Sequence, residues 1–114
     1  MVQMISKSEL NKEVQNIVNQ LVDLYQPEKI ILFGSLSKKD EIKDGTDIDL
    51  FVVKDNVPEY GADRIRELDR LTKYRLATDF IVYKPDELKK RLQLGDPFVK
   101  HIFSEGRVLY DVAA

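Results

Sequence analysis

Cysteine is absent from the 114-residue chain, and histidine occurs once, as His101. Without cysteine the chain can form no disulfide, no thiolate zinc site and no cysteine nucleophile. A lone histidine without an evident partner is a weak candidate for acid–base chemistry, and we expect His101 to be a surface or half-buried helix residue. Any metal site must therefore use hard oxygen ligands.

Strong net charge and long apolar runs are also missing. The 18 basic and 20 acidic residues leave a formal net charge of −2, a balance that does not favour non-specific nucleic-acid binding. No segment approaches the roughly 18 consecutive apolar residues that a membrane span requires, and the first residues lack the basic start and apolar stretch of a signal peptide. We expect a cytoplasmic protein without membrane attachment, folded as a single domain over residues 1–114 around one core.

The spacing of apolar residues predicts helices alternating with strands. Ser6 and Glu9 have the spacing of a capping box, which opens a helix that continues to Pro27. A stripe of apolar residues predicts a second helix from Ile65 to Leu76, whose flanking arginines, Arg64 among them, we expect to be solvated. The other predicted elements are strands over 29–33, 47–53, 78–83 and 108–110, helices over 86–94 and from 96–97 to 103, and a short helical turn within 36–46.

Acidic residues gather where predicted strands begin. Asp47 and Asp49 open the second strand, and Asp79 lies at the start of the third. Alternate residues of a strand share a face, so Asp47 and Asp49 point the same way. No basic residue lies between Ile48 and Val53, and a carboxylate in an apolar strand is costly unless it is solvated, paired or bound to a cation. The pattern predicts a cation site.

The first strand ends at Gly34-Ser35. Glycine lets the backbone approach an anion without a Cβ in the way, and Ser35 adds a hydroxyl donor beside backbone amides. Lys38 follows with a positive charge. These features suit a triphosphate, and three carboxylates can hold two divalent ions about 3.5–4 Å apart, as in two-metal phosphoryl-transfer sites.

This order of elements and residues resembles the minimal nucleotidyltransferases of the DNA polymerase β superfamily, and the ending Glu105 to Tyr110 is similar to theirs. The resemblance implies an α+β, polymerase β palm-like fold with a small mixed sheet and helices packed on it. It also implies two Mg²⁺ ions as cofactors and ATP as substrate. The residues that match the family's catalytic and metal-binding carboxylates are Asp47, Asp49 and Asp79, and those expected at the nucleotide are Gly34, Ser35 and Lys38.

The resemblance extends to the antitoxins of two-gene toxin–antitoxin modules. It implies transfer of AMP from ATP to a hydroxyl, a tyrosine, of a helical HEPN-type toxin encoded nearby. Lys39 stands where the family commonly has glycine, which motivates an alternative, a binding module that neutralises its partner by contact alone. A third interpretation treats the aspartates as ordinary turn and strand-edge residues of an α+β domain with another ligand. Both a monomer and an oligomer stay open.

Overall fold

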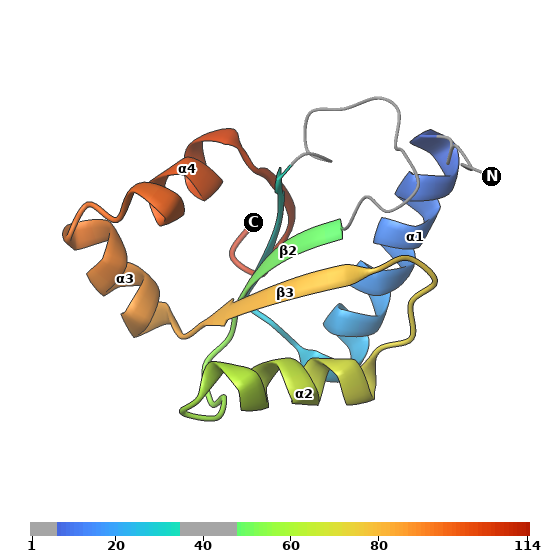
Figure 1. Ribbon diagram of the computed structural model, residues 1–114, viewed down its shortest axis with the longest axis horizontal. Helices are drawn as coiled ribbons and strands as arrows, with labels where there is room; N and C mark the ends of the chain where they lie inside the picture. The colour runs from blue at the N-terminus through green and yellow to red at the C-terminus, as the bar shows by residue number, and fades with distance from the viewer. Residues whose placement is uncertain (1–6, 35–47) are drawn as a thin grey trace.

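The computed structural model describes residues 7–34 and 48–114, and their elements alternate between helix and strand (Figure 1). The helices are α1 (Lys7–Gln20), its π-helical continuation η1 (Leu21–Tyr25), α2 (Gly61–Leu71), α3 (Pro85–Gln93) and α4 (Pro97–Glu105). The strands are β1 (Lys29–Phe33), β2 (Ile48–Val53), β3 (Thr78–Tyr83) and β4 (Arg107–Asp111). They form a mixed sheet in the order β3-β2-β1-β4, in which β1 is antiparallel to β2 and β4, and β2 is parallel to β3.

One face of the sheet packs against α1, η1 and α2. Along β2 and β3 every second residue, such as Leu50 and Phe80, points into this core, where it meets Ile17, Leu21 and Leu68 of the helices. Burying each of these large side chains contributes about 1.5–3 kcal/mol. The alternation along β2 and β3 therefore fixes which face carries their remaining residues, including the aspartates.

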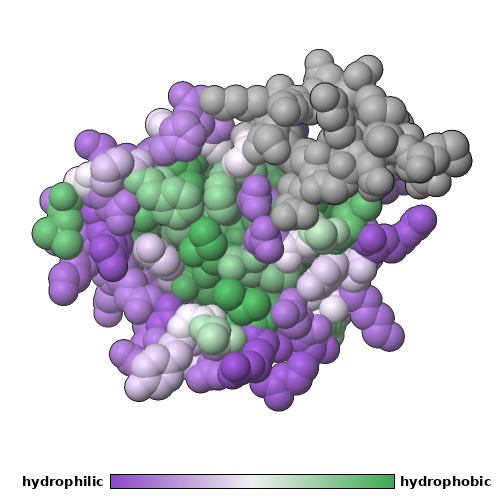
Figure 2. All heavy atoms as spheres, in the orientation of Figure 1, coloured by the Kyte–Doolittle hydropathy of each residue, from purple (hydrophilic) through white to green (hydrophobic). Residues whose placement is uncertain are grey.

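The opposite face carries a smaller apolar cluster. Phe51 and Ile31 of the sheet are buried there against Ile102 of α4, while Ile81 and Tyr83 are only partly covered. In Figure 1, α3 and α4 lie together on the left, away from α1. Figure 2 shows hydrophobic side chains gathered in the middle of the view, between that helix pair and the strands β2 and β3. This face is less completely covered by helices than the α1 face.

The sequence predicted the strands more closely than the helices. Strands over 29–33 and 78–83 are confirmed, β2 is described from Ile48 onward, and β4 extends one residue beyond the prediction at each end. The predicted helix start at Ser6 and the predicted helical turn within 36–46 lie outside the described residues. Within the described residues, 7–34 and 48–114, no helix is long and apolar enough to cross a membrane.

Two predictions about the second helix were wrong. It begins at Gly61 and ends at Leu71, so Leu76 lies beyond it. The backbone N–H and the hydroxyl of Thr72 both donate to the Leu68 carbonyl, at 3.0 and 2.6 Å, and Thr72 itself is extended. Arg64 is not solvated but only 4% exposed, because its guanidinium binds the Glu87 carboxylate and backbone carbonyls.

Candidate functional site

Asp49 and Asp79 lie directly opposite each other on the parallel strands β2 and β3. Phe33 of β1 is the cross-strand partner of Asp49 on the other side. Opposed residues share a face of the sheet with Cβ atoms about 5 Å apart. Because Leu50 and Phe80 point into the α1 core, the row Asp79–Asp49–Phe33 lies on the opposite face. The structure therefore brings together two of the three predicted carboxylates.

Gly34 adjoins the Asp49 carboxylate. Its φ is +77°, and a Cβ built on it would lie 2.3 Å from Oδ2 of Asp49 and 3.2 Å from Cγ. Any other residue would suffer both a clash and the strain of a left-handed backbone. The end of β1 is thus shaped to let its backbone lie against this carboxylate. The sequence predicted that Gly34 lets the backbone approach a phosphate, and it did not predict the contact with Asp49.

The geometry fits a hard divalent cation. Adjacent strands are about 4.8 Å apart, so carboxylates on neighbouring strands can both reach one ion at the usual 2.0–2.6 Å. Asp49 is half-buried and Asp79 is exposed. Asp47, Ser35 and Lys38 lie outside the described residues. Within the described part of the chain, no three His, Cys, Asp or Glu residues form a metal-binding group.

The negative charge of Asp79 acts on a neighbouring tyrosine. Tyr74 donates a hydrogen bond to Asp69 at 2.9 Å and packs edge-on against Phe80. Its phenol pKa is raised, chiefly by the hydrogen bond to Asp69, then by burial and the charge of Asp69, and last by the charge of Asp79. A neutral Tyr74 is therefore favoured beside the start of β3.

Glu13 of α1 supports the segment that leads into β3, a role that sequence reasoning missed. Its side chain is buried and accepts hydrogen bonds from the backbone N–H groups of Arg75 and Leu76, the latter at 3.0 Å. The sequence signal was present, since Glu13 lies three residues after Leu10 and four before Ile17, on the apolar stripe of the helix. An acid on a buried helix face needs partners, and here they are the amides that precede Asp79.

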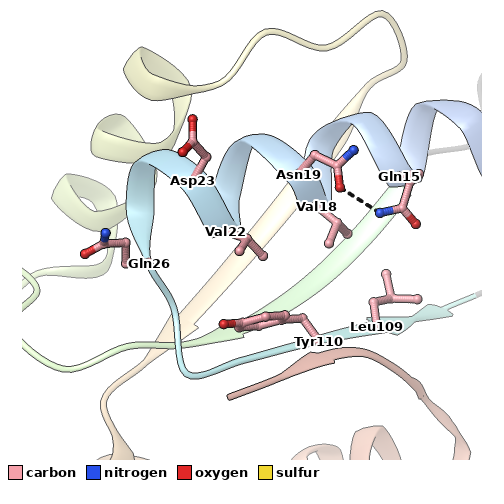
Figure 3. Close-up of a pocket in the computed structure, with 8 residues that line it drawn as sticks. All are labelled: Gln15, Val18, Asn19, Val22, Asp23, Gln26, Leu109 and Tyr110. Atoms are coloured by element: carbon pink, nitrogen blue, oxygen red, sulfur yellow. Dashed lines mark hydrogen bonds between the residues drawn. The ribbon is translucent and has the colours of Figure 1, made fainter. Parts of the chain in front are cut away.

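A separate hollow of about 460 Å³ lies between α1–η1 and β4 (Figure 3). Val18 and Val22 point from the helix toward Leu109 and Tyr110 of the strand. These side chains belong to the α1 side of the sheet, opposite the two aspartates. Among the described residues that line this hollow, only Asp23 is acidic. The described lining of the hollow has no pair of opposed carboxylates like that of the candidate site. The hollow is therefore a poorer candidate for a metal centre.

Comparison with known proteins identifies the fold and the family of the chain. The chain aligns with the crystal structure of a "putative nucleotidyltransferase from Sulfolobus solfataricus" with a TM-score of 0.61 and 22% identity, over 92% of this chain and 83% of that one. This likeness confirms the α+β nucleotidyltransferase fold. A search of the curated proteins finds no match. The family model of the nucleotidyltransferase domain matches residues 13–110, a range that includes Gly34, Asp49 and Asp79. The chain belongs to the nucleotidyltransferase domain family.

Proposed function

We propose that the protein transfers AMP from ATP to a tyrosine hydroxyl of a partner protein, with Mg²⁺ as cofactor. The observation that supports this most directly is the pairing of Asp49 with Asp79 across parallel strands, with the Gly34 backbone against Asp49. Two opposed carboxylates, one of them packed closely against the backbone of Gly34, suit a metal ion that carries a nucleotide.

The carboxylates have two roles in the proposed reaction, metal binding and acceptance of a proton. Asp49 and Asp79 hold the metal, with Asp47 as the third ligand expected from the sequence. Bound Mg²⁺ would neutralise phosphate charge and polarise the reacting oxygens. The acceptor oxygen forms a bond to the α-phosphorus, the bond to pyrophosphate breaks, and Asp79 accepts the hydroxyl proton. Positioning and charge stabilisation suffice for this chemistry, so a covalent nucleophile is not needed.

The acceptor in this proposal is a HEPN-type helical toxin, which makes the protein an antitoxin. The placement of Asp79 supports a protein acceptor. It is exposed, and it lies on β3, the outermost strand on that side of the described sheet. A tyrosine on the surface of a folded partner can therefore approach it from outside without unfolding.

Incubation of the protein with ATP, Mg²⁺ and the neighbouring gene's helical product tests the proposal. Intact mass spectrometry should show AMP on the partner. Asp49→Asn and Asp79→Asn should each lower the transfer rate by about 100-fold or more, the scale of removing one electrostatic contact to a transition state. Asp23→Asn is the matched control, because Asp23 is exposed on η1, on the other side of the sheet.

Two results would count against transfer. If the partner binds tightly but gains no AMP, the protein acts as the binding module that neutralises by contact alone. If both Asn variants keep full transfer, the two aspartates do not hold the metal.

A further inference from the structure

A half-exposed aromatic ring stands beside the row of carboxylates. Phe98 near the start of α4 is 47% exposed, although a large apolar side chain gains free energy when it is covered. Its ring meets that of Phe33 edge-on, with centroids 5.9 Å apart and an interplanar angle of 86°. Phe33 is in turn the cross-strand partner of Asp49. The row Asp79–Asp49–Phe33 thus continues into Phe98.

The backbone that carries Phe98 is firmly held. The Asp96 carboxylate caps α4 by accepting hydrogen bonds from the N–H groups of Phe98 and Val99, at 2.9 and 3.2 Å. Pro97 opens the helix, and Val99 is completely buried. A ring mounted on such a capped helix start loses little conformational entropy when a ligand covers it.

We propose that the exposed face of Phe98 stacks on the base of the bound nucleoside triphosphate, with Phe33 supporting the ring from its edge. This inference rests on the proposed function, because it takes the phosphates to lie at Gly34 and Asp49. The polar end of the nucleotide then meets the carboxylates and their metal, and its flat apolar end meets the aromatic pair. Every base has a π-face, so stacking is tolerant of base identity. The site takes nucleoside triphosphates as a class, with weak selection among bases.

Equilibrium binding of ATP and of inorganic tripolyphosphate, both with Mg²⁺, separates base stacking from phosphate binding. Phe98→Ala should weaken ATP binding by about 10-fold or more, the usual scale of a lost base–aromatic stack, and leave tripolyphosphate binding unchanged. Phe98→Tyr should keep ATP affinity near that of the unaltered protein. Leu94→Ala is the control, because Leu94 is 70% exposed at the end of the neighbouring helix α3.

A second variant allows the contact between residue 98 and the base to be measured directly by fluorescence. The chain has no tryptophan, so Phe98→Trp introduces a single indole. ATP should quench its fluorescence, and tripolyphosphate should not.

Several outcomes would overturn the stacking proposal. If ATP binds the unaltered protein and Phe98→Ala equally, or if the substitution weakens the binding of both ligands alike, the stacking proposal is wrong while the proposed function stands. If the unaltered protein binds neither ligand, both proposals fail. Loss of partner binding with ATP affinity intact would instead assign Phe98 to the protein interface.

Discussion

Substituting Gly34 by alanine tests the contact between the β1 terminus and Asp49. Gly34 and Gly95 have nearly equal positive φ angles, +77° and +75°. A Cβ at Gly34 would lie 2.3 Å from Oδ2 of Asp49, whereas a Cβ at Gly95 would meet nothing within 4 Å. Gly34→Ala and Gly95→Ala therefore share the backbone strain and differ in the clash, which makes the second a matched control.

The magnitudes follow from these distances. A non-glycine residue in the left-handed region costs about 1–2 kcal/mol, and for a domain of this size each kcal/mol lowers Tm by roughly 4 °C. Gly95→Ala should melt about 4–8 °C below the unaltered protein, and Gly34→Ala, which adds the clash to the same strain, should melt at least as far below it. Real Cβ contacts essentially never fall under 3.0 Å, so the atoms at Gly34 must separate by at least 3.0 − 2.3 = 0.7 Å. A misplacement near 1 Å costs on the order of 100-fold in rate.

AMP transfer to the partner and Mg²⁺–ATP binding are the assays, with thermal melting to measure the shared strain. Gly34→Ala should lose about 100-fold in transfer, and Gly95→Ala should keep the original rate at the assay temperature. Full transfer by Gly34→Ala would refute the reasoning that the carboxylate must stay where the glycine allows it. An equal loss in both variants would assign the effect to strain alone.

Two further predictions concern carboxylates that hold distant parts of the chain together. Glu87→Gln should destabilise the fold by about 1–2 kcal/mol, less than for a fully buried ion pair, because the Glu87 side chain is 42% exposed. The hydrogen bond from Arg64 lowers the pKa of Glu87 below its usual 4.5, so its stabilising contribution is present above pH 4.5 and lost as the pH falls through the folded pKa. Melting curves of Glu87→Gln should therefore depend less on pH below 4.5 than those of the unaltered protein, and an unchanged acid profile would contradict the pairing. Glu13→Ala should lower the free energy of unfolding by about 2–3 kcal/mol and speed hydrogen exchange at the amides of Arg75 and Leu76, because it removes their charged acceptor. Unchanged exchange at these amides would show that Glu13 does not hold this segment.

Periodicity in the sequence predicted what depends on local alternation. The strand over 78–83 and its two faces are as expected, with Asp79 and Ile81 opposite the buried Phe80. The contact between Gly34 and Asp49 could not be derived from spacing, because it depends on the register of β1 against β2. That register is a tertiary property, so the two residue types that suit a site could be identified from the sequence but the distance between them could not.

Charged residues on helices were harder to interpret for the same reason. Arg64 and Glu13 look like ordinary members of helices with a solvated face, yet both are buried by partners far along the chain. Glu87 is 23 residues from Arg64, and Leu76 is 63 residues from Glu13. Helical periodicity predicts contacts between residues three or four positions apart, and it does not predict contacts between residues so far apart in the chain.

The parallel pairing of β2 with β3 determines when the two proposed metal ligands first come together during folding. Asp49 and Asp79 are 79 − 49 = 30 residues apart, and their strands meet only after the chain has crossed over through α2. During synthesis, a nascent chain that has exposed β1 and β2 but not β3 holds only part of the carboxylate set. If the proposed site binds nucleotide and metal, these ligands stabilise the finished sheet rather than any earlier intermediate, and their effect comes late in folding.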